Sequence, residues 1–293
     1  MKNKYPLVSI VIPCYNHEKF VQESIQSVID QTYNNIELII IDDGSKDSSV
    51  VKIQEMIESC KERFVRFEFR SRDNVGLSAT LNEALEWCKG KYFSAIASDD
   101  QMISDKTEVQ VEFLESNKEV VVVFGGVILI NESNEHIEIN AGAGQFYSFE
   151  DIILHNYNLP APTQMIRSES LREVGGYSPT LFIEDWYMWL KLSQLGSIYA
   201  LNNILCHYRM HYDNSSKNII KMNGARLDVL AVFKDSILYE ESLKRTKWLN
   251  SYEYFIVHRK ATTLLNLWKL NPKKTSLLII DYYKRYRKIK RNR

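Results

Sequence analysis

The sequence predicts an α/β protein with a mostly parallel central sheet flanked by helices, followed by a C-terminal helical appendage. Three observations support this fold class. Strand-like and helical segments alternate over the first hundred residues, the strand-like segments are continuously apolar, and the pattern from residue 219 onward is helical. Such alternation is typical of a parallel sheet with helices on both faces, and continuously apolar strands are typical of strands buried on both sides. We expect one domain over residues 1–218, with halves at 1–103 and 104–218, and helices over 219–293.

Four strands and three helices are expected in the first half. The first strand is β-branched and ends at Pro13, as expected for a buried strand followed by a turn. Between strands, apolar residues such as Phe20, Ile25 and Ile29 recur at helical spacing. The expected strands are 7–13, 36–41, 64–69 and 91–97, and the expected helices are 18–31, 46–60 and 74–88.

The second half is less regular. Ser104 and Asp105 are suited to cap a helix over 106–116. Glu184 and Asp185 open another helix, and both acids would favour its dipole whether or not they have a further role. The remaining expected strands are 120–130, 137–139, 164–167 and 198–205, with helices at 149–156 and 169–174 and roughly three helices in the tail, broken near 249–252 and 271–272.

Composition narrows the class of protein. Lys+Arg and Asp+Glu both number 37, so the overall charge gives no indication of a nucleic-acid partner. Four scattered cysteines suggest reduced thiols in the cytoplasm, and we expect neither a signal peptide nor a membrane span. The last twelve residues, 282–293, carry seven Lys/Arg and no acid. They are either a solvated helix end or a surface that docks on anionic lipid; nucleic acid is the less favoured third reading.

Polar side chains follow three of the four strands of the first half. Tyr15 and Asn16 follow the first, Asp42 and Asp43 end the second, and Asp99-Asp100 follows the fourth. The carboxyl ends of parallel strands line one crevice, where ligands bind. Asp99 and Asp100 either begin the next helix or hold a divalent cation, and Mg²⁺ and Mn²⁺ favour carboxylates together with substrate phosphates. Because no glycine-rich phosphate loop is present, a metal on Asp100 is the favoured way to neutralise phosphates.

Several motifs in order resemble family 2 glycosyltransferases with the GT-A fold. The likeness covers about residues 5–217, and six motifs in the right order make it specific. The matching segments are 6–16 (PLVSIVIPCYN), 31–33 with 37–45 and Asp47, 74–77 with Asn82, Ala84 and 90–92, 98–100 (SDD), 175–177 with 184–185 and 189–192, and Tyr208-Arg209 with His211 and Ser215.

The resemblance implies a set of donor contacts in the first half, which becomes the nucleotide half. Asp43 would accept a hydrogen bond from uracil, and Asp99 would contact the ribose. Many relatives carry Arg where this chain has Thr80, so a diphosphate contact from that helix is not expected. The other implied contacts are the base with Pro13, Tyr15 and Asn16, and the ribose or diphosphate with Asn74 and Gly76.

The resemblance also implies the metal and the catalytic groups. Asp100 would coordinate Mn²⁺ or Mg²⁺ on the diphosphate, and His211 would approach the metal or the diphosphate. In the acceptor half, Asp185 would be the catalytic base, with Glu184 beside it. Taken alone, His211 is more often a surface or hydrogen-bonded histidine.

We therefore expect an inverting, metal-dependent glycosyltransferase that moves a sugar from a nucleoside diphosphate to a hydroxyl of a glycan or lipid-linked acceptor in surface polysaccharide synthesis. UDP is the favoured nucleotide, although thymine fits similar contacts. The expected location is cytoplasmic, with peripheral attachment to the inner face of the membrane through the basic tail, and a homo-oligomer is left open. The alternatives are a non-catalytic nucleotide-binding scaffold and a sugar nucleotidyltransferase, which would want a glycine-rich basic loop that residues 14–19 do not provide.

Overall fold

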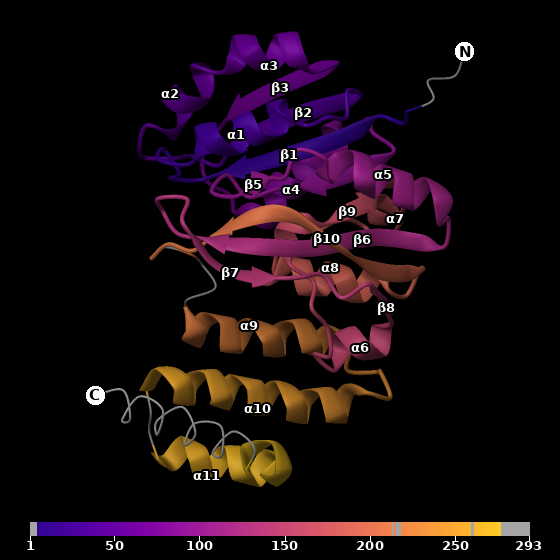
Figure 1. Ribbon diagram of the computed structural model, residues 1–293. Helices are drawn as coiled ribbons and strands as arrows, with labels where there is room; N and C mark the ends of the chain where they lie inside the picture. The colour runs from indigo at the N-terminus through magenta and orange to yellow at the C-terminus, as the bar shows by residue number, and fades with distance from the viewer. Residues whose placement is uncertain (1–4, 213, 215–217, 259–260, 277–293) are drawn as a thin grey trace. The chain divides into compact units, whose positions relative to one another are not determined.

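The computed structural model describes residues 5–212, 214, 218–258 and 261–276 (Figure 1). The chain forms two compact units. The first comprises Met1–Ile152 and Tyr157–Asn214, and the second comprises Ile153–Asn156 and Ser215–Arg293. Each unit is described by itself.

The first unit is built on one ten-stranded sheet with the order β3-β2-β1-β4-β9-β6-β10-β5, in which β7 pairs with β6 and β8 with β10. Strands β1 to β4 are parallel to one another, so their carboxyl ends meet at one edge. The strands are β1 Val8–Cys14, β2 Ile36–Asp42, β3 Arg66–Ser71, β4 Tyr92–Ala95, β5 Gln101–Met102, β6 Val120–Ile130, β7 His136–Asn140, β8 Gln145–Tyr147, β9 Met165–Arg167 and β10 Ser197–Arg209.

The rest of the sheet is mixed. Strand β9 runs antiparallel to both β4 and β6, whereas β10 and β6 are parallel. The fold class is confirmed, with the parallel order confined to the nucleotide half and to the β6–β10 pair. Strand β10 is longer than the expected 198–205 and includes Arg209, because pairing with β6 continues through Ile130.

Helices flank this sheet, as the apolar periodicity requires. The expected helix over 46–60 is two helices, α2 and α3, and the expected helix over 149–156 ends at Ile153. The helices of the first unit are α1 Val21–Ile29, α2 Ser49–Gln54, α3 Ile57–Arg63, α4 Leu77–Trp87, α5 Lys106–Ser116, α6 Phe149–Ile153, the short 3₁₀ helix η1 Ala161–Thr163, α7 Ser168–Glu173 and α8 Glu184–Leu192. The last residue of α6, Ile153, is the first residue of the second unit.

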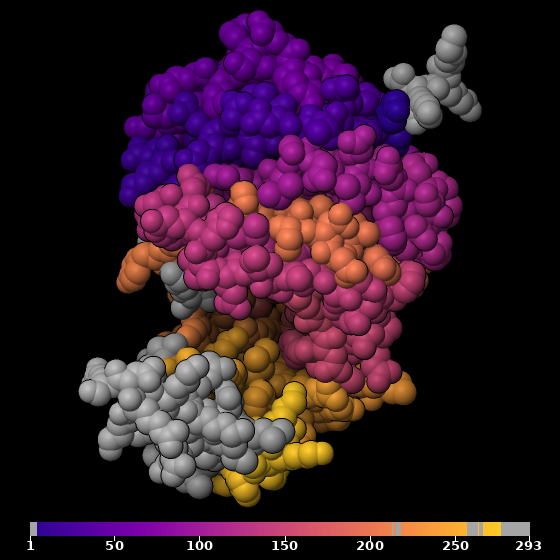
Figure 2. Space-filling view, in the orientation of Figure 1, coloured from indigo at the N-terminus to yellow at the C-terminus, as the bar shows by residue number. Residues whose placement is uncertain are grey.

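The core of the first unit lies where the sheet meets these helices. Strand residues such as Ile10 and Leu38 pack with Val21 and Ile25 of α1 and with Leu114 of α5, all fully buried. The space-filling view shows the outer surface of this unit, coloured from indigo at the N-terminus through magenta to orange (Figure 2). Burial on both faces explains why these strands read as continuous apolar runs in the sequence. The same packing holds the loops at the strand ends in place.

The second unit is helical. Its helices are α9 Ile219–Val232, α10 Tyr239–His258 and α11 Ala261–Leu270. The expected break near 249–252 is wrong, because α10 continues through it with Trp248 and Tyr252 stacked one turn apart. The expected break near 271–272 agrees with the end of α11. The basic stretch 282–293 lies outside the described residues. Among the described residues, we find no helix that is both long and apolar enough to span a membrane.

Candidate functional site

The loops after β1 and β2 are tied together at the carboxyl edge of the sheet. Asn16 adopts a positive φ of 55°, which asparagine tolerates better than most residues. Its backbone N–H donates to Ser45 Oγ at 2.9 Å, and its Oδ1 accepts from the Lys46 N–H at 2.7 Å. Tyr15, next to it, is 45% exposed. The structure therefore leaves an aromatic ring accessible at this edge, beside the partly buried Pro13.

Asp43 lies at the centre of the neighbouring loop contacts. Its carboxylate accepts backbone N–H groups of Val75 and Gly76, both at 2.9 Å, and it pairs with the Arg72 guanidinium. These contacts bring the segment containing Asn74 and Gly76 next to the end of β2. Gly76 has a φ of 95° at the start of α4, a conformation that favours glycine.

Arg72 is a candidate residue that sequence reasoning missed. It follows β3, donates to Thr80 Oγ1 at 2.8 Å and pairs with Glu83 at 2.8 Å. Its contact with Thr80 places a guanidinium beside the position where many relatives carry Arg. The available signal was its position after a parallel strand, since polar residues at such ends face the ligand crevice.

Three possible metal ligands meet beyond the end of β4. The nitrogen or oxygen atoms that His17, Asp99 and His211 offer all lie within 4.8 Å of one another. His211 Nε2 is 2.8 Å from Asp99 Oδ2, and His17 Nδ1 is 3.9 Å from Asp99 Oδ1 and 2.7 Å from Ser98 Oγ. Asp99 and His211 are each 6% exposed. The sequence predicted His211 here but missed His17, whose signal was a polar side chain directly after Asn16.

Electrostatics distinguishes Asp99 from its neighbour. Burial opposes ionisation of Asp99, but the hydrogen bond to His211 and the nearby His17 hold the pKa of its carboxyl below the ordinary value. An ionised carboxylate between two imidazoles is a donor set that fits a divalent transition-metal ion, and fits Mn²⁺ better than Mg²⁺. The residues present therefore fit the metal that the family resemblance implies.

The carboxyl group of Asp100 makes a different contact, with the backbone of β10. Asp100 is 1% exposed, and its Oδ1 accepts the backbone N–H of Arg209 at 2.8 Å. Burial and the charge of Asp99 raise the pKa of Asp100 well above its usual value. Among the described residues, the clustered potential ligands do not include Asp100. The candidate cluster therefore contains Asp99, whereas the carboxylate of Asp100 accepts from the backbone of β10, and the metal role expected for Asp100 stays a prediction.

Arg209 connects these elements. Its side chain is fully buried, and its Nε donates to the Asp99 carbonyl at 2.8 Å while Nη2 pairs with Glu23 at 2.7 Å. Together with the Arg209 N–H to Asp100, these bonds fasten the end of β10 to the turn after β4. They set the distance between Asp99 and His211, which lies two residues beyond Arg209.

A second acidic pair opens α8. Burial, and then the charge of Asp185, raise the pKa of Glu184 to about 8. Burial also raises the pKa of Asp185, whose Oδ1 accepts the Trp186 N–H at 2.6 Å. Carboxylates with raised pKa values can take up a proton near neutral pH. The structure therefore places Glu184 and Asp185 where proton transfer is chemically reasonable.

The loop before α8 is anchored to the nucleotide half. Asn82 on α4 exchanges two hydrogen bonds with the backbone of Tyr177, both at 2.7 Å. Gly176 precedes this contact, with a φ of 72°, and a Cβ there would meet Asn82 Oδ1 at 2.6 Å. The glycine at position 176 is thus explained by a close approach of its backbone to the Asn82 side chain.

The family is decided by the sequence match. Glycosyl transferase family 2 matches residues 9–175, more than half of the chain. The chain belongs to this family. The match includes His17, Asp43 and Asp99, whereas Asp185, His211 and the helices of the second unit lie beyond it.

Two similar proteins are also named glycosyltransferases. An uncharacterized glycosyltransferase of Rickettsia bellii is 30% identical over 274 residues, which are 89% of this chain and 37% of that protein. The chain thus spans well under half the length of that relative. The Escherichia coli protein named UDP-Glc:alpha-D-GlcNAc-diphosphoundecaprenol beta-1,3-glucosyltransferase WfgD is 29% identical over 252 residues, covering 84% of this chain and 92% of that protein.

A solved structure supports the fold. The mannosyltransferase PcManGT from Pyrobaculum calidifontis, in complex with GDP-Man and Mn²⁺, superposes with a TM-score of 0.68 and covers 98% of this chain and 83% of that one. The sequence identity is 13%, so the likeness concerns the fold alone. It confirms the glycosyltransferase fold expected from the motifs.

Proposed function

We propose that this family 2 glycosyltransferase is metal-dependent and inverting, and that it moves a sugar from a UDP-sugar to a hydroxyl of a glycan or glycolipid acceptor. The observation that carries the proposal is the cluster of His17, Asp99 and His211 on the sheet edge that also holds Asp43 and Asn16. A cation at the cluster would offset the charge of a nucleoside diphosphate, and the polar side chains at the strand ends would bind its base and ribose.

The nucleotide would lie along the ends of β1, β2 and β3. Tyr15 would stack on the base, with Pro13 and Asn16 lining it. Asp43, fixed by the Val75 and Gly76 amides, would accept from the base. Asn74 and Gly76 would then lie by the ribose or the diphosphate, and Arg72 would add a positive charge to this edge.

Asp99, His211 and His17 would hold the divalent cation. When bound, the cation would act as a Lewis acid and offset the negative charge that develops on the leaving diphosphate. Arg209 would keep Asp99 and His211 at ligand spacing. Asp99 would then be a metal ligand in place of its expected ribose contact, and Asp100 would serve the architecture of the site.

Asp185 would remove the proton from the acceptor hydroxyl as that oxygen attacks the anomeric carbon. General-base catalysis of this kind typically contributes about 10²–10⁴-fold, and holding donor and acceptor in line contributes more. Glu184 would raise the basicity of the pair. Direct displacement inverts the anomeric centre and needs no enzyme nucleophile. Burial raises the pKa of Cys14, the thiol beside this edge, to about 11, which agrees with such a mechanism.

The relative in Escherichia coli suggests the wider setting. The name of that protein describes transfer from UDP-Glc to a diphosphoundecaprenol-linked sugar. We extend this to the present chain as a UDP-sugar donor, a lipid-linked saccharide acceptor, and a role in surface polysaccharide synthesis on the cytoplasmic side of the membrane. Attachment through the basic residues 282–293 remains part of this proposal.

Calorimetric titration of UDP, dTDP and GDP, with and without Mn²⁺, tests the donor half. We expect Mn²⁺-dependent UDP binding that is lost in Asp99→Ala and kept in His136→Ala, a matched histidine control on β7. Screening of UDP-sugars for transfer then tests turnover. Failure of every nucleotide to bind the folded protein would contradict the donor assignment, and binding without turnover on any acceptor would favour the scaffold alternative.

A further inference from the structure

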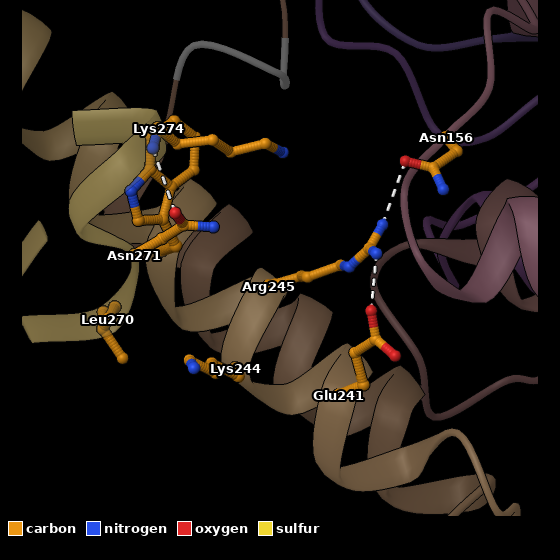
Figure 3. Close-up of a pocket in the computed structure, with 8 residues that line it drawn as sticks. Asn156, Glu241, Lys244, Arg245, Leu270, Asn271 and Lys274 are labelled. Carbon is orange, nitrogen blue, oxygen red and sulfur yellow. Dashed lines mark hydrogen bonds and ion pairs between the residues drawn. The ribbon is translucent and has the colours of Figure 1, made fainter. Parts of the chain in front are cut away.

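The second unit contains a cavity of about 520 Å³ that lies outside the family match. One wall is a single face of α10, where Glu241, Lys244, Arg245 and Trp248 follow one another at helical spacing. The facing wall comes from the end of α11 and the turn after it, and Asn156 closes one side (Figure 3). The remaining lining residues are Leu270, Asn271 and Lys274. Its volume falls within the ~300–1,000 Å³ typical of small-molecule sites.

The charge of this cavity is positive. Three cationic side chains and one acid line it. Glu241 is neutralised by Arg245 at 2.5 Å, and Arg245 also reaches Asn156 Oδ1 at 3.0 Å (Figure 3). In the part of the second unit that the structure describes, the ion pairs are Arg245–Glu241 and Arg226–Glu253. Lys244 and Lys274 therefore contribute charge that no described acid offsets.

The pKa of a buried histidine in the same unit is a second indication of this positive charge. His155 is bonded through Nε2 to Thr246 Oγ1 at 2.9 Å. Burial, followed by the charges of Arg226, Arg245 and Lys274, lowers the pKa of His155 to about 4. Two of the three cations named are cavity-lining residues, so their charge is felt within the protein and not only by solvent.

An aromatic ring with a fixed orientation completes the cavity. The Trp248 ring stacks on Tyr252 with centroids 5.3 Å apart and planes 9° apart, and its Nε1 donates to Thr275 Oγ1 at 3.2 Å. The Lys274 ammonium lies 5.2 Å from the ring centroid. Because these contacts orient the indole, a sugar ring that binds against it would not have to order it first. The side-chain amides of Asn156 and Asn271 supply hydrogen-bonding groups for hydroxyls.

We propose that this cavity binds the phosphate-bearing end of the saccharide acceptor, with phosphate oxygens on Lys244, Lys274 and Arg245 and the adjoining sugar against Trp248. The inference rests on the proposed function in taking the acceptor to be a phosphate-linked saccharide. Lysine and arginine bind phosphate through charge-assisted hydrogen bonds. The combination of cations, amides and an aromatic ring suits a sugar phosphate better than either a neutral glycan or bare phosphate.

Binding to the full-length chain in EDTA tests the proposal, because chelation removes metal-dependent phosphate binding at the first unit. The probes are N-acetylglucosamine 1-phosphate, inorganic pyrophosphate and unphosphorylated N-acetylglucosamine, followed by tryptophan fluorescence and calorimetry. We expect the sugar phosphate to bind more tightly than either of the other two. The double variant Lys244→Ala/Lys274→Ala should weaken it at least about tenfold, since both ammonium groups that would bind the phosphate oxygens are lost. Lys234→Ala, an exposed lysine outside the cavity, is the matched control.

Two further measurements separate the possible failures. Trp248→Leu should weaken the sugar phosphate but leave pyrophosphate unchanged. UDP binding with Mn²⁺, measured on the same double variant, should match that of the parent chain; its absence from the parent would overturn the proposed donor site and leave the cavity result standing. Equal affinity of the double variant and Lys234→Ala for the sugar phosphate would overturn the cavity proposal. So would vesicles of phosphatidylglycerol that bind in a Lys244- and Lys274-dependent way while the sugar phosphate does not, since the cavity would then serve a membrane surface.

Discussion

Two pairs of adjacent acids in the first unit show how surroundings decide chemistry. Asp99 lies against two histidines, and its pKa is lowered, whereas Asp100 is enclosed without such partners, and its pKa is raised. At the start of α8, burial raises the pKa of both Glu184 and Asp185. The surroundings therefore favour the charged form of Asp99 and disfavour the charged forms of the other three acids.

The largest expected effect comes from removing the charge of Asp99. Asp99→Asn keeps the shape of the side chain but deletes the anion between His17 and His211. We expect Mn²⁺ affinity to fall by at least about 100-fold, because even partners outside the ligand set commonly contribute 10–100-fold. Manganese binding followed by electron paramagnetic resonance measures this directly, without turnover. Unchanged Mn²⁺ affinity would remove Asp99, and with it the cluster, from the proposed metal site.

Loss of the base in the second pair should affect turnover alone. Asp185→Asn removes the proton acceptor and leaves the cluster around Asp99 untouched. We expect kcat to fall by about 10²–10⁴-fold, with UDP and Mn²⁺ binding within about twofold of the parent. Steady-state kinetics and calorimetry on one preparation separate the two effects. Retention of normal kcat would show that another group takes the proton.

The pH dependence of turnover sharpens the same comparison. A base with a raised pKa is protonated at low pH, so kcat should rise with pH as the Glu184–Asp185 pair loses its proton; burial raises the pKa of both acids, that of Glu184 to about 8. The two acids titrate as a coupled pair, and the profile reports the pair. Glu184→Gln removes a neighbouring negative charge, which lowers the pKa of Asp185 and moves the rise to lower pH. If Glu184→Gln did not shift the pH dependence of kcat, this pair would not be the group whose titration controls turnover.

The sequence predicted which polar side chains follow the parallel strands, because that depends on local patterns. Apolar strands and the polar residues that follow them specified where Asn16, Asp43 and Asp99 would meet, and parallel pairing of β1, β2 and β4 brought them together. These features are encoded within a few residues of each strand end.

Roles that depend on distant contacts were not predictable in this way. The side chain of Asp100 is directed by Arg209, 109 residues away, and His17 joins the cluster only through its contacts with Ser98 and Asp99. The motif alone therefore does not tell which of two adjacent acids lies in the cluster with the histidines. The expected break in α10 was wrong for a similar reason, since Asn250 and Glu253, in or next to residues 249–252, are bonded to residues of α9 far away in the sequence.

The smallest expected effect comes from Asp100. Burial and the charge of Asp99 disfavour the charged form of Asp100 and raise its pKa, and an amide oxygen can replace its carboxyl as acceptor for the Arg209 N–H. Asp100→Asn should therefore change Mn²⁺ affinity by less than about threefold and the free energy of unfolding by about 1 kcal/mol at most. Paired with Asp99→Asn, it is a substitution of identical chemistry one residue away. A loss of metal binding in Asp100→Asn equal to that in Asp99→Asn would return Asp100 to the metal site and contradict the separation of roles between these neighbours.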